Sequence, residues 1–169
     1  MSLDAHTLAT LAAMPDRLEA AFRLVPRSHH HWRPASWDAI PGEQFSAVGQ
    51  VCHLRDIEVD GYHVRIARML AEEDPSLVSV DGYDLAERRG YRVTDPEQAL
   101  ASFRSAREVT LRRLQGLTDE QLARRGTFAE YGSLTLHSLV FYLESHDLQH
   151  LACMGWLLGK IAADARRRS

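Results

Sequence analysis

Two histidines four residues apart, His146 and His150, lie within an apolar stretch toward the C-terminal end of the chain. Leucine, methionine and isoleucine recur around them at the spacing of one helix face, which predicts a long helix whose apolar face carries both imidazoles. Residues four apart on a helix are neighbours, with Cβ atoms about 5–6 Å apart. Burying an imidazole without a partner costs about 1–3 kcal/mol. A shared metal ion is one partner that would explain both rings.

A third ligand must come from another part of the chain, and His53 is the best candidate. It lies at the border of the apolar stripe of a helix predicted over about 43–72. His63, inside that stripe, could replace or assist it. Three imidazoles leave a divalent ion with its full charge and an open position, which is typical of a catalytic site. Hydrogen-bonded core histidines are the alternative interpretation, and the adjacent histidines 29–31 are expected to be solvent-exposed.

A dinuclear carboxylate site is a second metal hypothesis. Di-iron bundles combine Glu-x-x-His on two helices with a glutamate from each of two others. The pairs Asp60/His63 and Asp147/His150 have this spacing, but with aspartate in place of glutamate. The first and third predicted helices also lack an obvious core-facing glutamate. The three-histidine site is therefore favoured.

Four amphipathic segments position these residues, and no alternating strand pattern of useful length is found. The pattern predicts an all-α protein, an antiparallel four-helix bundle, in one domain over 1–169. Pro15 predicts a kink or break in the first helix, and Asp95-Pro96 is a strong start for the third. A short helical turn is expected after Thr118. The predicted helices cover about 4–24, 43–72, 95–116 and the region from Ser133 or Thr135 onward.

The second helix has an apolar stripe into which two polar residues fall, Asp56 and His63. A polar residue in a core stripe needs a partner. The apolar members of the stripe are Phe45, Val48, Cys52, Val59, Ile66 and Leu70.

Composition sets limits on the partners. Hydrophobic residues make up 45% and charged residues 25% of the chain, and the formal net charge is -3, so nothing predicts nucleic-acid binding. No signal segment or membrane-spanning run is present. Cys52 and Cys153 lack CxxC spacing and are both expected to be buried. We expect a cytoplasmic protein that acts on a small-molecule substrate, with no nucleic acid and no membrane as partner.

The order and spacing of several short motifs together resemble the DinB-like superfamily, also called the DinB/YfiT-like metalloenzymes. The resemblance covers most of the chain. It rests on Trp37 followed by His53-Leu-x-Asp56-x-Glu58, on Phe103-x-x-x-Arg107, on Gly132-x-Leu-Thr135, and on His146-Asp147-x-x-His150-Leu.

This resemblance implies a four-helix bundle of DinB/YfiT-like type with a three-histidine metal site. One ligand comes from the second helix and two from the fourth, which correspond to His53, His146 and His150 here. Zinc or nickel is the preferred divalent ion, with iron or manganese as alternatives. Several members are homodimers, so we expect a homodimer. Characterised branches use low-molecular-weight thiols, and many other members are described only as metal-dependent hydrolases.

The leading hypothesis from the sequence is a metal-dependent S-transferase that binds a low-molecular-weight thiol as thiolate. Asp56, one turn from His53, could accept the other ring N–H of a ligand. Glu58 and Asp147 are further candidates for this role, and Arg107 could contact a carboxylate of the substrate or the thiol. No catalytic residue is assigned.

Two alternatives remain. One is a metal-dependent hydrolase that uses a metal-bound hydroxide, with Asp56 or Asp60 as general base. The other is a non-catalytic metal-binding stress-response protein. The loop over 26–42, which contains Trp32 and Trp37, fits either a dimer contact or the mouth of the site.

Overall fold

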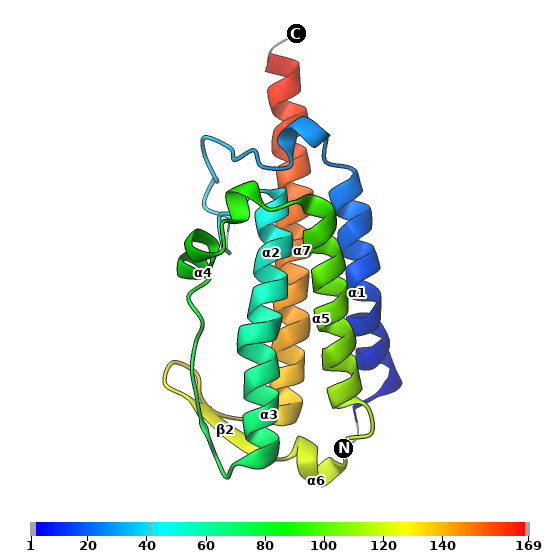
Figure 1. The fold of residues 1–169 in the computed structure, drawn as a ribbon, viewed down its shortest axis with the longest axis vertical. Coiled ribbons are helices and arrows are strands. Elements are labelled where there is room, and N and C mark those ends of the chain that lie inside the picture. The colour runs from blue at the N-terminus through cyan, green and yellow to red at the C-terminus, as the bar shows by residue number, and fades with distance from the viewer. Residues whose placement is uncertain (1–2, 41, 168–169) are drawn as a thin grey trace.

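The structure is a computed structural model that describes residues 3–40 and 42–167. Four long helical segments form a bundle (Figure 1), and the predicted all-α four-helix bundle is confirmed. One of the four is continuous through three consecutive elements, two α-helices with a π-helical turn between them. The segments are α1 (Ala5–Arg23), the run of α2 (Ala47–Asp56), η2 (Ile57–Tyr62) and α3 (His63–Ala71), α5 (Pro96–Leu114), and α7 (Leu136–Arg167).

Two consecutive helical segments of the bundle run in the same direction. In Figure 1, α1 and α7 run upward, whereas α2–α3 and α5 both run downward. Parallel neighbours need a long connection, because the chain must return to the end at which it started. Residues 72–95 make this crossover, which contains β1 (Ser76–Leu77), α4 (Gly82–Arg88) and η3 (Tyr91–Val93). Its middle part packs on α2 beside His53.

A small sheet at one end of the bundle was not predicted. Strand β1 pairs in parallel with β2 (Arg125–Phe128), and β2 pairs antiparallel with β3 (Gly132–Thr135). These strands are too short for an alternating pattern to show in the sequence. The short helix α6 (Asp119–Leu122) precedes them, as expected after Thr118, and the structure shows a capping box between Thr118 and Gln121. Thr135, the last residue of β3, accepts a hydrogen bond from the Ser138 backbone N–H and caps α7.

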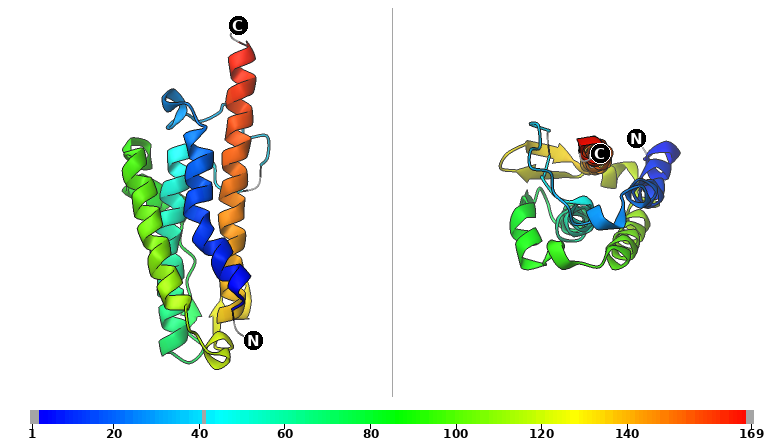
Figure 2. Two further views of the ribbon diagram at one scale, coloured as in Figure 1. Left: turned by 90° about the vertical axis from the view of Figure 1, so that its right-hand side faces the viewer. Right: turned by 90° about the horizontal axis from the view of Figure 1, so that it is seen from above.

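Helix α1 continues through Pro15, which is buried, and bends within its N-terminal half (Figure 2). The 3-10 turn η1 (Arg27–His29) and an extended loop then lead to α2. Trp37 anchors this loop by stacking on Trp156 of α7, with ring centroids 5.2 Å apart. The loop therefore lies against α7 and delivers the residues just before α2 to the middle of the bundle. In the described part of the chain, no helix is both long and apolar enough to span a membrane.

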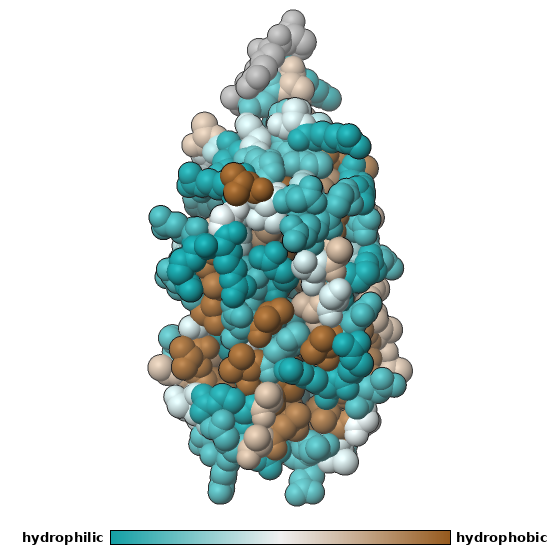
Figure 3. Space-filling view, viewed as in Figure 1, coloured by the Kyte–Doolittle hydropathy of each residue, from teal (hydrophilic) through white to brown (hydrophobic). Residues whose placement is uncertain are grey.

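The π-helical turn η2 changes which residues of the second helical segment face the core. Residues five apart share a face in a π turn, whereas they diverge in an α-helix. Glu58 and His63 accordingly both contact Thr110 of α5. Val59, predicted to be a core residue by regular helical spacing, is 39% exposed. That prediction is wrong because the extra residue of the π turn shifts the helix phase. The face of the molecule drawn in Figure 3 carries exposed apolar patches in its lower half.

Arg107 of α5 connects all four helical segments from the middle of the core. Its side chain is 1% exposed. It forms paired hydrogen bonds with Glu58 at 2.8 and 2.9 Å, and with Asp147 of α7 at 2.6 and 2.9 Å. It also donates to the backbone carbonyl of Leu11 in α1 at 3.1 Å. A buried cation between two carboxylates fixes the rotation of each helix, because any slip would leave a charge unpaired.

We expect Arg107→Ala to lower the free energy of unfolding by about 3–5 kcal/mol, because it leaves two buried carboxylates without a counter-charge. Urea denaturation followed by circular dichroism measures this change. The matched control is Arg112→Ala on the same helix, whose side chain is 66% exposed and 3.9 Å from Glu108. The control should change stability by less than about 0.5 kcal/mol. A loss below about 1 kcal/mol for Arg107→Ala would contradict the central role of this arginine.

Candidate metal centre

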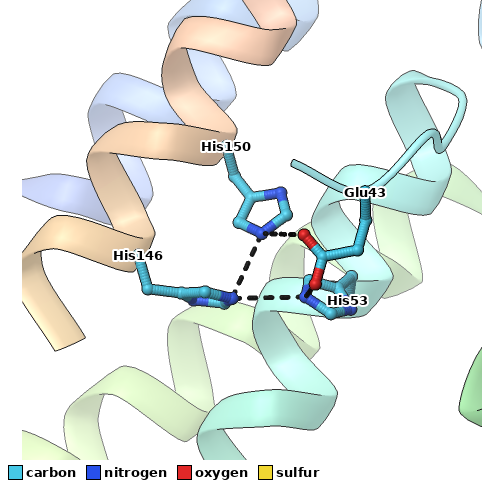
Figure 4. Close-up of side chains that lie close together, drawn as sticks. All are labelled: Glu43, His53, His146 and His150. Carbon is cyan, nitrogen blue, oxygen red and sulfur yellow. Dashed lines mark hydrogen bonds and ion pairs between the residues drawn. The ribbon is translucent and has the colours of Figure 1, made fainter. Parts of the chain in front are cut away.

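The structure brings three predicted ligands together at the middle of the bundle. His146 and His150 project from α7, and His53 projects from α2 (Figure 4). The Nε2 atom of His146 lies 3.2 Å from Nε2 of His53 and 3.1 Å from Nε2 of His150. His53 and His150 are each only 1% exposed. Three imidazole nitrogens from two helices thus converge on one point.

Glu43 is a fourth member of the cluster, and sequence reasoning missed it. Its carboxylate oxygens lie 3.3 Å from Nε2 of His53 and 3.6 Å from Nε2 of His150. Among the described residues, these four form the group of His, Cys, Asp or Glu side chains that could hold an ion. Glu43 precedes α2 in an irregular segment, so no periodicity marks it. The only signal in the sequence is its position ten residues before His53.

Gln50 sets the tautomer of His150. Its amide nitrogen donates to the backbone carbonyls of Glu43, at 3.0 Å, and Phe45, at 3.2 Å. The amide oxygen is therefore the acceptor that faces Nδ1 of His150. Since Nδ1 carries the proton, the lone pair of His150 is on Nε2 and points into the cluster. One fully buried side chain thus orients a ring of the cluster and holds the segment that carries Glu43.

Burial keeps the rings on α7 neutral. Desolvation, with repulsion from His53, lowers the pKa of His146 to about 3. Desolvation and the neighbouring imidazoles also lower the pKa of His150 well below its ordinary value. A hydrogen bond from His53 lowers the pKa of Glu43 to about 2, so this carboxylate is ionised at neutral pH. Neutral imidazole and ionised carboxylate are the forms that bind a metal.

His53 is held differently from the other two rings. Its Nδ1 atom is buried and has no hydrogen-bond partner. Among the described residues, no other buried side-chain nitrogen or oxygen lacks one. This edge of the ring packs against Gly82 at the start of α4, where an added Cβ would lie 2.7 Å from Nδ1. Only glycine leaves room for the ring at this point, so the crossover fixes His53 by contact.

A cavity of about 430 Å³ opens onto the cluster. This volume is in the range of small-molecule sites. His53, His146 and Glu43 line one part of it. Aromatic and aliphatic side chains supply most of the remaining wall, namely Ile57, Tyr62, Val80, Phe128, Tyr131, Leu134, Leu139 and Tyr142.

The residues expected to orient the ligand rings lie elsewhere. Asp56 does not contact a histidine: it bonds to Arg55 at 2.6 Å, Tyr91 at 2.7 Å and Arg89 at 2.7 Å. It thereby ties α2 to the crossover. The prediction that Asp56 supports a ligand ring is wrong because its position on the helix turns it toward these three side chains. Asp60 pairs with Arg89 at 2.6 Å, so neither acid is placed as a general base.

Glu58 and Asp147 contact Arg107 rather than the imidazoles. Their influence on the cluster is indirect, because Asp147 directly follows His146 in the chain and holds the rotation of α7. Arg107 has no free edge for a ligand carboxylate. Its pKa is raised by Asp147 and Glu58, although burial opposes the shift.

The remaining histidines do not join the cluster. His63 bonds through Nε2 to Thr110 and to the backbone carbonyl of Ala106. His30 contacts the carbonyl of Val25. The dinuclear hypothesis is not supported either. Asp60 pairs with Arg89 at the surface and Asp147 pairs with Arg107 in the core, so the two carboxylates are not brought together.

The donor set fits a single divalent ion. Zinc binds imidazole nitrogen at about 2.0–2.1 Å, which places two tetrahedral ligands about 3.3–3.4 Å apart. The separations of 3.1 and 3.2 Å between the Nε2 atoms are close to this value. Three imidazole nitrogens match the preference of zinc, nickel and iron for this ligand, and a carboxylate borders them. The metal itself stays a prediction.

The fold and this histidine cluster together define a class of helical bundle with a candidate metal centre. A model of the DinB superfamily matches residues 10–154, so the chain belongs to this superfamily. Its fold is similar to that of YfiT from Bacillus subtilis, with a TM-score of 0.81 and 20% sequence identity over 95% of this chain and 91% of that chain. That protein is described as "a probable metal-dependent hydrolase with an unusual four-helix bundle topology". No curated protein matches the chain.

We expect Gln50→Leu to weaken zinc binding about 10- to 100-fold, because His150 loses the acceptor that fixes its tautomer. Isothermal titration of zinc into metal-free protein measures the affinity. Gln98→Leu, a change at an exposed position on α5, is the matched control and should bind zinc as wild type does. Equal affinities for both variants would show that Gln50 does not orient His150.

Proposed function

We propose that this protein is a metal-dependent hydrolase of a small-molecule substrate. In this proposal His53, His146 and His150 hold one divalent ion, and the cavity beside them receives the substrate. The observation that carries the choice is Glu43, whose carboxylate oxygens lie 3.3 Å from Nε2 of His53 and 3.6 Å from Nε2 of His150. Hydrolysis needs a base beside the attacking water, and Glu43 is the carboxylate in that place.

Each part of the proposed site has a distinct role. A divalent ion bound by the histidines supplies positive charge that polarises a carbonyl or phosphoryl oxygen and lowers the pKa of water. Glu43 Oε accepts the proton of the attacking water and can return it to the leaving group. Gln50 and Gly82 keep the rings of His150 and His53 in position. The aromatic and aliphatic side chains in the cavity wall lower the local dielectric beside the cluster and so strengthen these electrostatic interactions.

Transfer of a low-molecular-weight thiol is the second candidate. His146 and His150 stay neutral at physiological pH, so a divalent ion keeps the charge that stabilises a thiolate. Burial raises the pKa of both Cys52 and Cys153, so neither supplies the nucleophile and the thiol must come from solution. Thiol transfer gives Glu43 a smaller role, because a bound thiol ionises more readily than water.

The homodimer and the cytoplasmic location remain predictions.

Glu43→Gln tests the base. Zinc-loaded wild type and variant would be assayed on a panel of aryl esters and amides, with and without added cysteine. We expect turnover without thiol, and a kcat roughly 10²–10⁴-fold lower for Glu43→Gln. Zinc content should be unchanged if Glu43 acts as a base. The control Glu108→Gln changes an exposed glutamate on α5 and should have wild-type kcat.

Two results would count against hydrolysis. Turnover that requires cysteine would establish the thiol transferase instead. Turnover that survives Glu43→Gln would remove Glu43 from the mechanism.

A further inference from the structure

Arg65 of α3 is a second deeply buried arginine, and its surroundings differ from those of Arg107. It is 8% exposed and lines the same cavity as His53 and His146. No carboxylate of the described residues forms an ion pair with it. The charge of Glu130 acts on Arg65 from beyond ion-pair distance, and Glu130 accepts a hydrogen bond from Ser79 Oγ at 3.2 Å. Burial without a counter-charge lowers the pKa of Arg65.

The hydrogen bonds of Arg65 use only one edge of its guanidinium group. Nε and Nη2 both donate to the backbone carbonyl of Val78, at 3.3 and 2.9 Å. The edge formed by Nη1 and the second N–H of Nη2 has no acceptor among the described residues. A guanidinium edge with two parallel N–H groups matches the two oxygens of a carboxylate.

The guanidinium group is also held in place before any ligand arrives. Its central carbon lies 5.3 Å from the ring centroid of Tyr62 and 5.0 Å from that of Phe128. Gly61 leaves room for it, because an added Cβ would lie 3.0 Å from Nη1. Such fixation reduces the conformational entropy lost on binding.

The π turn places Arg65 on the cavity side. His53, Ile57, Tyr62 and Arg65 all line the cavity, although the step from Ile57 to Tyr62 is five residues. Regular α-helical spacing would turn Tyr62 and Arg65 away from the face that carries His53. The same turn that aligns Glu58 with Arg107 thus brings a buried cation into the candidate substrate cavity.

We propose that Arg65 binds a carboxylate group of the small-molecule substrate in the cavity beside the three histidines. The substrate class is therefore a carboxylic acid whose apolar or aromatic body contacts Tyr62, Phe128 and Tyr131. This inference rests on the proposed function for the assignment of the cavity as a substrate site. Arg65 thus determines specificity, and the bound carboxylate balances the charge of Arg65 that the described residues leave unpaired.

Binding of benzoate and of benzamide, its neutral analogue of similar shape, tests this directly. Both would be titrated by NMR into metal-free and zinc-loaded protein. We expect wild type to prefer benzoate roughly 10- to 100-fold in both forms, because a hydrogen-bonded pair of opposite charges binds more tightly than a neutral pair. Arg65→Gln should abolish the preference, and Arg65→Lys should keep part of it, since it retains the charge. Arg17→Gln, at an exposed position on α1, is the control and should behave as wild type.

Equal binding of the two probes to wild type would overturn the proposal, and so would a preference that survives Arg65→Gln. Absence of binding up to the solubility limit would overturn it as well. If Arg65→Gln does not fold, Arg65→Lys decides the question. A benzoate affinity and a benzoate-to-benzamide ratio equal to those of wild type would rule out a carboxylate bound by two parallel N–H groups of Arg65.

Two further comparisons separate the possible causes. Mercaptoacetate and 2-mercaptoethanol form a thiol pair that differs in the carboxylate. One outcome is that zinc-loaded protein prefers mercaptoacetate to 2-mercaptoethanol only when Arg65 is present, but binds benzoate and benzamide equally. In that case Arg65 recognises the carboxylate of a thiol cofactor and not of the substrate, and the proposal fails. A benzoate preference in protein that takes up no zinc would sustain the carboxylate site while the hydrolase proposal fails.

Discussion

Arg107 holds the four helical segments of the bundle in register through one buried ion-pair network. Its guanidinium group binds Glu58 and Asp147 and reaches the carbonyl of Leu11, so one side chain connects all four helical segments. A slip of any helix would leave a charge buried without a partner, at a cost of several kcal/mol. Exposed ion pairs such as Arg23–Glu97 exert no comparable control, because solvent screens them. Asp147 directly follows His146, so the network also sets the direction in which the imidazoles of α7 point.

A π-helical turn lets one helical segment serve two neighbours. Glu58 and His63 face α5, whereas His53, Tyr62 and Arg65 face the cavity. A regular helix would not keep both sets on their faces across this length. The crossover that follows then packs Gly82 against His53. Structural stability and the candidate site therefore depend on the same local departure from regular geometry.

Sequence reasoning predicted what periodicity and residue type determine. The four-helix bundle and the proximity of His146 and His150 follow from helical spacing, whereas the cap at Asp95 and the short helix after Thr118 follow from residue type. Glu43 and Gln50 were missed because one lies in an irregular segment and the other resembles any polar residue near a helix start. The exposure of Val59 and the contacts of Asp56 could not be predicted, since both depend on the π turn and the crossover. The short strands carry too few residues to form a pattern.

The most direct test of this account is the metal content of untagged protein, measured by elemental analysis beside His53→Ala and the double variant His146→Ala/His150→Ala. His63→Ala is the matched control, because this buried histidine bonds to Thr110 outside the cluster. We expect about one equivalent of a divalent metal in wild type and in the control, and its loss in both ligand variants. Wild type that takes up no divalent metal on titration would contradict it, and the three histidines would then be core residues.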